Sequence, residues 1–216
     1  MSAGATTGLG FEHVLVRGSG AGTLLLLHAT GGDEHQLVDV GRELAGEATL
    51  LSPRGQVLEH GVTRRFFRRH GTFELDIPDL LARTDELAEF IAAATAAYDL
   101  DPDRVLALGY SNGANIAVSL LLRRPEALAG AVLLRSTLPY TPDARPRLDG
   151  KPVLLLGGER DPFVPRDRYD QLVTTLKTGG AELTATLMPG GHQLSNVDLE
   201  LAAGWLLEHA PALGWR

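Results

Sequence analysis

Short runs of apolar residues alternate along this chain with longer segments in which apolar residues recur every three to four positions. A run such as TLLLLH at residues 23–28 is apolar at nearly every position, which is typical of a β-strand covered on both faces. Apolar or alternating runs predict strands at residues 13–17, 23–28, 48–54, 104–110, 130–136, 152–159 and 181–189. Helical spacing predicts helices at residues 35–46, 83–100, 112–125, 165–180 and 196–210. This alternation indicates an α/β fold, with a mostly parallel twisted sheet and helices on both faces.

The pattern also suggests where elements begin and how many domains the chain forms. Thr84 lies near the start of the helix predicted at 83–100, where its hydroxyl can cap the first turn. The segment 55–80 has weak periodicity and is expected to cross the surface between elements. No repeat or linker interrupts the 216 residues, a length that suits one core. We therefore expect residues 1–216 to form a single domain.

Composition and charge narrow the class of protein. The chain carries 27 acidic and 20 basic side chains, a formal net charge of −7, which argues against nucleic-acid binding because a phosphate-binding surface needs a basic excess. It has no cysteine, which excludes disulfides and a cysteine nucleophile. The opening residues MSAGATTGLGFEH do not resemble a signal peptide, and no apolar run approaches the ~20 residues of a membrane span. We expect a cytoplasmic protein without a membrane partner.

One serine lies where a strand is predicted to turn into a helix. In the stretch LALGYSNGANIA, residues 106–117, Ser111 lies between Gly109 and Gly113 in a G-x-S-x-G pattern. This pattern is the nucleophile elbow, in which small residues let the strand and helix approach while the serine hydroxyl is held clear of them. A plain glycine-rich turn is the alternative. The strand-to-helix position favours a catalytic nucleophile.

A serine nucleophile needs a histidine base and an acid that orients it, in the chain order serine, acid, histidine for this architecture. Of the two histidines after Ser111, His209 lies within the last predicted helix, whereas His192 lies in the loop MPGGHQLS after a strand. His192 is therefore the expected base, with an ordinary surface histidine as the alternative. Asp161 and Glu159 both lie where the preceding strand ends. Asp161 is preferred because Pro162 fixes its turn, and Glu159 is the rival.

The oxyanion formed during acyl transfer needs two backbone N–H donors. One is expected from Asn112, the residue after the nucleophile, and the other from the loop HATGGDE after an early strand, with Thr30 as the donor. His28 ends that strand and precedes the nucleophile, so we interpret it as a structural, hydrogen-bonding histidine.

Together these residues resemble serine hydrolases of the α/β-hydrolase fold. More narrowly, the chain resembles the small bacterial carboxylesterase/phospholipase group related to acyl-protein thioesterases. The resemblance covers about residues 13–209 and is carried by LLLLHATGGDEHQL, LSPRGQVLEHGVTRRFFRR, DLLARTDELAEFI, LGYSNGANIAVSLLL, GGERDPFVP and GGHQLS. It implies a minimal hydrolase core without a large lid domain, and Ser111, Asp161 and His192 as the catalytic triad. Ala29 departs from the glycine usual in this family, and its methyl group is expected to narrow the oxyanion loop.

The substrate pocket is less defined by the sequence. In RRFFRRHGTFELD, residues 64–76, four arginines flank Phe66 and Phe67. These phenylalanines either belong to the core beneath a solvated basic patch or line an acyl pocket, with an arginine that recognises a carboxylate. Leu138 and Pro139 follow another strand and are expected to shape the acyl pocket.

Other chemistries find no support in the sequence. It contains no G-x-x-x-x-G-K-[ST] phosphate loop, no dinucleotide fingerprint and no H-E-x-x-H, and its seven histidines are not clustered at metal spacing. We expect a serine carboxylesterase that needs no cofactor or metal and acts on a small-molecule ester, short-chain or aromatic. A thioesterase, a dienelactone-hydrolase-like enzyme and a non-catalytic small-molecule receptor are the alternatives, and a homodimer stays open.

Overall fold

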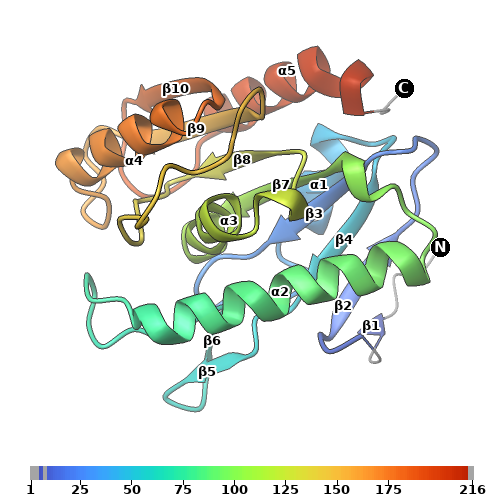
Figure 1. Cartoon of the computed structure of the whole chain (residues 1–216), viewed down its shortest axis with the longest axis horizontal. Helices are drawn as coiled ribbons and strands as arrows, with labels where there is room; N and C mark the ends of the chain where they lie inside the picture. Colours follow the sequence, from blue (N-terminus) through green and yellow to red (C-terminus); the bar gives the residue numbers. More distant parts are fainter. Residues whose placement is uncertain (1–4, 7–8, 214–216) are drawn as a thin grey trace.

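A computed structural model describes residues 5–6 and 9–213 (Figure 1). Its main sheet has eight strands in the order β1-β2-β4-β3-β7-β8-β9-β10. The strands of this sheet are β1 (Ala5–Thr6), β2 (His13–Val16), β3 (Thr23–Leu27), β4 (Thr49–Pro53), β7 (Val105–Tyr110), β8 (Gly130–Leu134), β9 (Pro152–Gly158) and β10 (Glu182–Met188). Strand β2 is antiparallel to both β1 and β4, and the neighbours from β4 to β10 are parallel.

Five α-helices cover this sheet. They are α1 (Val38–Leu44), α2 (Ile77–Ala97), α3 (Asn112–Arg123), α4 (Arg166–Thr178) and α5 (Asn196–Leu213), with short 3-10 helices at Pro102–Arg104 and Pro125–Ala127. Figure 1 shows α2 and α3 on the near side of the sheet. None of the described segments forms a separate lid domain.

Strand β3 shows why the central strands are apolar at every position. Leu25 and Leu27 pack in one buried cluster with residues of α2, α3 and α4. Leu24 and Leu26 point the other way, into a second cluster with residues of α1 and α5. All four leucines are fully buried, because side chains alternate between the faces of a strand and both faces are covered. The predicted fold class is confirmed.

The predicted strands and helices are all present, and the largest difference lies at the start of α2. The helix begins at Ile77 and not near residue 83, with the Asp76 side chain accepting a hydrogen bond from Asp79 N and Pro78 in the first turn. Thr84 is therefore not an N-cap. It lies mid-helix and fully buried, where its hydroxyl donates to the Leu80 carbonyl.

The segment 55–80 is also more ordered than its weak periodicity suggested. It contains an antiparallel hairpin of β5 (Val57–Glu59) and β6 (Thr63–Arg65), then a bridge between Arg69 and Leu75. The hairpin contacts the loop after β3, since Gly31 N donates to Arg64 O at 2.8 Å. The segment thus builds one wall of the molecule beside that loop.

The parallel strands end at the same edge of the sheet. The loops after β3, β7, β9 and β10 carry Thr30, Ser111, Asp161 and His192 respectively. In open α/β sheets, functional groups gather at this edge. No helix in the described part of the chain is both long and apolar enough to cross a membrane. Among residues 5–6 and 9–213 no cluster of three or more histidine or acidic side chains could hold a metal ion.

Candidate active site

Ser111 lies on a sharp turn between β7 and α3. Its backbone has φ 54° and ψ −110°, a combination that an L residue rarely adopts. Two hydrogen bonds hold the turn, from Ser111 N to Leu134 O and from Asn115 N to Ser111 O, both 2.9 Å. Strain of this kind, held by its surroundings, is found at functional sites.

The two flanking glycines are required by close backbone contacts. A Cβ on Gly109 would lie 2.7 Å from the backbone N and Cα of Ala114, and one on Gly113 would lie 2.0 Å from the Leu27 carbonyl oxygen. Neither neighbour is a flexible side chain that could move away. The G-x-S-x-G spacing therefore reflects the packing of β7 and α3 against β3.

The structure brings Ser111, His192 and Asp161 into one hydrogen-bonded chain. His192 Nε2 lies 2.8 Å from Ser111 Oγ, and His192 Nδ1 lies 2.8 Å from Asp161 Oδ2. With Nδ1–H donating to the carboxylate, the Nε2 lone pair faces the serine hydroxyl. This is the arrangement of nucleophile, base and orienting acid.

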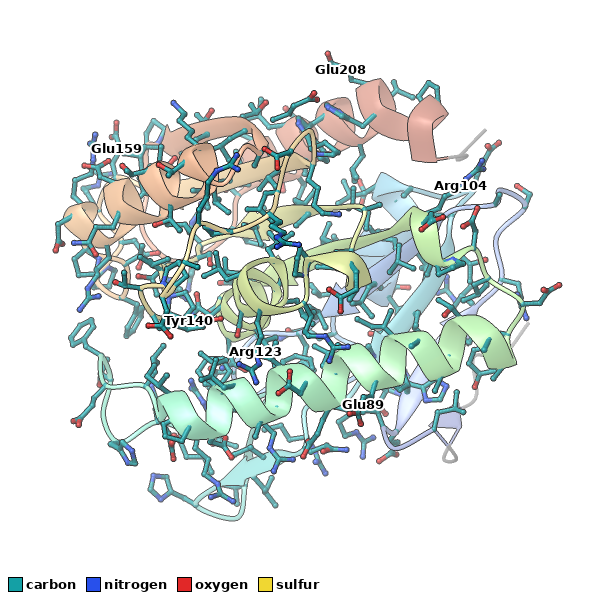
Figure 2. The ribbon with its side chains drawn as sticks, in the orientation of Figure 1. Glu89, Arg104, Arg123, Tyr140, Glu159 and Glu208 are labelled. Atoms are coloured by element: carbon teal, nitrogen blue, oxygen red, sulfur yellow. The ribbon has the colours of Figure 1, made fainter. Side chains whose placement is uncertain are left out.

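The rival carboxylate, Glu159, is not part of this chain. Figure 2 shows its side chain at the periphery of the molecule, and it is exposed. The Asp161 side chain is fully buried, and its Oδ1 accepts hydrogen bonds from Phe163 N at 2.8 Å and Val164 N at 3.3 Å. The turn that Pro162 begins therefore fixes this carboxylate in place.

Thr30 and Asn112, the expected oxyanion donors, both border the cleft that contains Ser111. Within the described residues, neither backbone N–H donates to a protein acceptor. Asn112 is the first residue of α3, so its N–H belongs to the unpaired donors of a helix N-terminus. Both groups are thus available to bind a developing negative charge.

Hydrogen bonds from several directions fix the loop after β3. His28 is buried, with Nδ1 2.7 Å from Ala29 O, and its Nε2 accepts from Gly55 N at 2.8 Å. Burial lowers the pKa of His28, which keeps the ring neutral. Ala29 N donates to Gln36 Oε1 at 2.8 Å, and Ala29 has no positive φ, so its methyl group adds no backbone strain. His28 thus has the structural contacts expected of it.

Arg135 and Asp198 hold the loop of His192, and the sequence analysis missed both. Their side chains are 1% and 0% exposed and form a two-pronged ion pair with both distances 2.8 Å. Arg135 also donates to the carbonyl oxygens of Gly191, at 2.9 Å, and Gln193, at 3.2 Å. Gly191 and Gln193 flank His192, so the ion pair holds the His192 loop on both sides.

The charge state of Asp198 supports this role. Burial alone would raise the pKa of Asp198, but hydrogen bonds from Arg135 and Ser195 outweigh it and hold the pKa below its ordinary value. An arginine near the end of the apolar strand predicted at residues 130–136 is the sequence signal for this pair.

Two aromatic side chains complete the surroundings of His192. The Tyr110 hydroxyl donates to His192 O at 3.1 Å, and burial raises the pKa of that hydroxyl, which keeps its proton. Phe163, half exposed, meets the imidazole edge to face, with ring centroids 4.9 Å apart. The His192 ring is therefore held in one orientation while Ser111 stays partly exposed.

A cleft of about 950 Å³ opens over Ser111. Leu138 and Pro139 line it, as expected. Phe66 and Phe67 do not: they are 2% and 0% exposed and belong to the core cluster. The interpretation of these phenylalanines as substrate-binding residues is therefore corrected, because the β5–β6 hairpin turns them inward.

Several known proteins are similar to this chain in sequence and fold. The family described as Phospholipase/Carboxylesterase matches residues 14–209. MhqD of Bacillus subtilis (strain 168), provisionally named a hydrolase, is 40% identical over 197 residues, 91% of this chain and 98% of MhqD. A crystal structure of the Bacillus cereus carboxylesterase superposes with a TM-score of 0.88 at 38% identity, over 92% of this chain and 94% of that chain. A structure of YahD with malic acid gives a TM-score of 0.87 at 31% identity, over 92% and 98%. The family expected from the sequence is confirmed, and the chain belongs to the phospholipase/carboxylesterase family of α/β-hydrolases.

Proposed function

We propose that this protein is a serine carboxylesterase that hydrolyses short-chain or aromatic carboxylic esters through an acyl-enzyme on Ser111. The observation that carries the proposal is the pair of 2.8 Å contacts that join Ser111 Oγ to His192 Nε2 and His192 Nδ1 to Asp161. The family adds ester hydrolysis as the class of reaction. That YahD was solved with malic acid favours a small acyl group over a long lipid chain.

The first half of the reaction forms the acyl-enzyme. Ser111 Oγ attacks the ester carbonyl carbon while His192 Nε2 takes the hydroxyl proton. Asp161 stabilises the imidazolium that results, and the N–H groups of Thr30 and Asn112 bind the carbonyl oxygen as it becomes negative. His192 then gives its proton to the leaving alcohol oxygen as the carbon–oxygen bond breaks.

The second half releases the acid. A water molecule takes the place of the alcohol. His192 Nε2 removes a proton from this water as the water oxygen attacks the acyl carbon of the Ser111 ester. The oxyanion forms and collapses on the same two donors, and Ser111 Oγ leaves with the proton that His192 returns. No step requires a cofactor. The cytoplasmic location, the lack of nucleic-acid and membrane partners, and a homodimer stay predictions from the sequence.

Labelling with a fluorophosphonate tests the nucleophile. We expect one adduct per chain, on Ser111, by intact mass and peptide mapping, and loss of p-nitrophenyl butyrate hydrolysis in Ser111→Ala. Ser136 is a matched control: its hydroxyl donates to Asn115 Oδ1 at 3.0 Å, and no histidine among the described residues forms a hydrogen bond with it, so it should not be labelled. No adduct, or an adduct elsewhere, would overturn the proposal.

The alternative functions predict different substrate preferences. A thioesterase would hydrolyse a butyryl thioester with a kcat/KM above that of the matched ester, and a dienelactone-hydrolase-like enzyme would prefer an unsaturated lactone. A receptor would bind esters without turnover. We expect the oxygen ester to give the highest kcat/KM.

A further inference from the structure

Arg65 is a buried cation that has no carboxylate partner among the described residues. It lies at the end of β6, is 4% exposed and borders the cleft over Ser111. Its Nη1 donates to Thr30 Oγ1 at 2.8 Å and its Nε to Phe67 O at 3.2 Å. The guanidinium carbon lies 5.6 Å from the centroid of the Phe67 ring. All of these partners are uncharged.

Other arginines in this part of the molecule are paired with acids. Arg135 pairs with Asp198, Arg54 with Glu34, and Arg69 with Glu59 through two hydrogen bonds of 2.9 and 3.0 Å. Glu59 attracts Arg65 at longer range, but its hydrogen bonds go to Arg69, so among the described residues no carboxylate contacts the Arg65 guanidinium directly.

Arg65 keeps its charge under ordinary conditions. Burial, and then the neighbouring charge of Arg69, lowers the pKa of Arg65 to about 10, with Glu59 acting in the opposite direction, and this pKa is still well above neutral pH. A buried charge without a counter-charge is costly. Within the described residues Nη2 donates to no protein atom, so it is available to an anion in the cleft.

The place of Arg65 indicates which part of an ester would carry this anion. Thr30 binds Arg65 through its hydroxyl, and its backbone N–H is the proposed donor to the carbonyl oxygen of the acyl group. The leaving alcohol must instead lie beside His192 Nε2, which protonates it. A group that reaches Arg65 from the reacting carbonyl therefore belongs to the acyl part.

We propose that Arg65 binds a carboxylate on the acyl part of the substrate, so that the preferred substrates are half-esters of short dicarboxylic acids. This inference rests on the proposed esterase function. The guanidinium fork suits a carboxylate, which it can bind through two parallel hydrogen bonds. Hydrolysis of such a half-ester by water gives the dicarboxylate, the alcohol and one proton.

Two esters of equal shape and different charge test the proposal. Monoethyl glutarate is an anion, and ethyl glutaramate replaces its carboxylate with an uncharged amide. We expect kcat/KM for the anion to exceed that for the amide by about 10- to 100-fold in the wild-type protein, the range of a hydrogen-bonded charge pair. In Arg65→Met the ratio should fall to about one or below, and in Arg65→Lys, which keeps the charge without the fork, it should lie between.

Arg168 provides a matched control. It also borders the cleft but is exposed, so its charge is screened by water and salt. Arg168→Gln removes one positive charge from the same cleft and should change the ratio by less than about threefold. A similar fall in Arg168→Gln and Arg65→Met would show that the overall charge of the cleft, and not Arg65, selects the anion.

A binding measurement separates this inference from the esterase proposal. Calorimetry with Ser111→Ala, which cannot form an acyl-enzyme, should give tighter binding of monoethyl glutarate than of ethyl glutaramate, and the difference should vanish when Arg65→Met is added. Equal binding, with equal turnover by the wild type, would overturn the role of Arg65 and leave the esterase proposal standing. If Ser111→Ala binds monoethyl glutarate selectively but the wild type shows neither turnover nor fluorophosphonate labelling, the esterase proposal is wrong and the anion site at Arg65 stands.

Discussion

Ser111 is both the proposed nucleophile and a residue with a strained backbone, and the two properties can be separated by mutation. Its φ of 54° and ψ of −110° cost an L residue about 1–3 kcal/mol, whereas glycine adopts such a conformation freely. Ser111→Ala removes the hydroxyl but retains the strain. We therefore expect urea unfolding to show that Ser111→Gly has a higher free energy of unfolding than Ser111→Ala, by up to ~2 kcal/mol. Both variants should be inactive. Equal stability would show that the elbow stores no strain.

Asp161 and Glu159 are two carboxylates close in sequence with different surroundings. Asp161→Asn keeps the bulk but presents an amide to His192 Nδ1, which favours the wrong tautomer, so kcat for an ester should fall by about 10²–10⁴. Glu159→Gln, at an exposed carboxylate, is the control and should be near neutral. The reverse result would assign the acid to Glu159. Unfolding curves for both variants should confirm that the proteins remain folded.

The site residues that could be predicted from the sequence are those marked by their immediate neighbours in the chain. Ser111 and His192 follow strands and are accompanied by glycines that open the turn, so chain order and local pattern were enough to place them. Arg65 was visible only as one of four arginines. Which of the four turns inward depends on the β5–β6 hairpin, whose pairing joins Val57 to Arg65, and no local periodicity encodes such a pairing.

At the scale of elements, strong periodicity predicts the strands and helices, whereas the start of α2, which has a proline in its first turn, differs from the prediction. The first turns of α2 contain Ile77 and Pro78, and a proline reads as a break when the N-cap before it is not recognised. Thr84 then looks like the cap, because threonine is a good N-cap residue. The true cap, Asp76, lies within the segment 55–80, whose periodicity is weak.

Helix α5 reaches the active site through the ion pair of Asp198 with Arg135. Asp198→Asn leaves a buried arginine without a counter-charge, and we expect a loss of about 3–5 kcal/mol in the free energy of unfolding. Because Arg135 holds the carbonyls of Gly191 and Gln193, the His192 loop should shift, and kcat/KM should fall by about 10²-fold, the typical cost of a 1 Å displacement.

A double variant separates position from stability. Arg135→Met with Asp198→Leu removes both charges and should recover much of the lost stability, yet it cannot donate to the two carbonyls, so activity should stay low. Asp170→Asn is the control, since its ion pair with Arg166 is 54% and 71% exposed and such pairs contribute little. Recovery of activity together with stability in the double variant would argue against a positioning role.

Across the whole molecule, the same short segments contribute to both the core and the cleft. The stretch RRFFRR places Arg65 at the cleft and Phe66 and Phe67 in the core. Leu138, in the loop after β8, is 5% exposed and likewise contributes to both the core cluster and the lining of the cleft. Stability and substrate preference should therefore respond differently to mutations at neighbouring positions, according to whether a side chain borders the cleft.

This division gives a test with two phenotypes. Phe67→Ala should lower the free energy of unfolding by about 3–5 kcal/mol and leave the preference among acetyl, butyryl and hexanoyl esters unchanged, because Phe67 does not border the cleft. Leu138→Ala should enlarge the cleft and shift that preference toward longer acyl groups by roughly tenfold per methylene accommodated, since one buried methylene is worth about 1–3 kcal/mol. Urea unfolding and kcat/KM for the three p-nitrophenyl esters provide both readouts. If the chain-length preference changes in Phe67→Ala and stays the same in Leu138→Ala, then Phe67 contacts the acyl group and Leu138 serves the core alone.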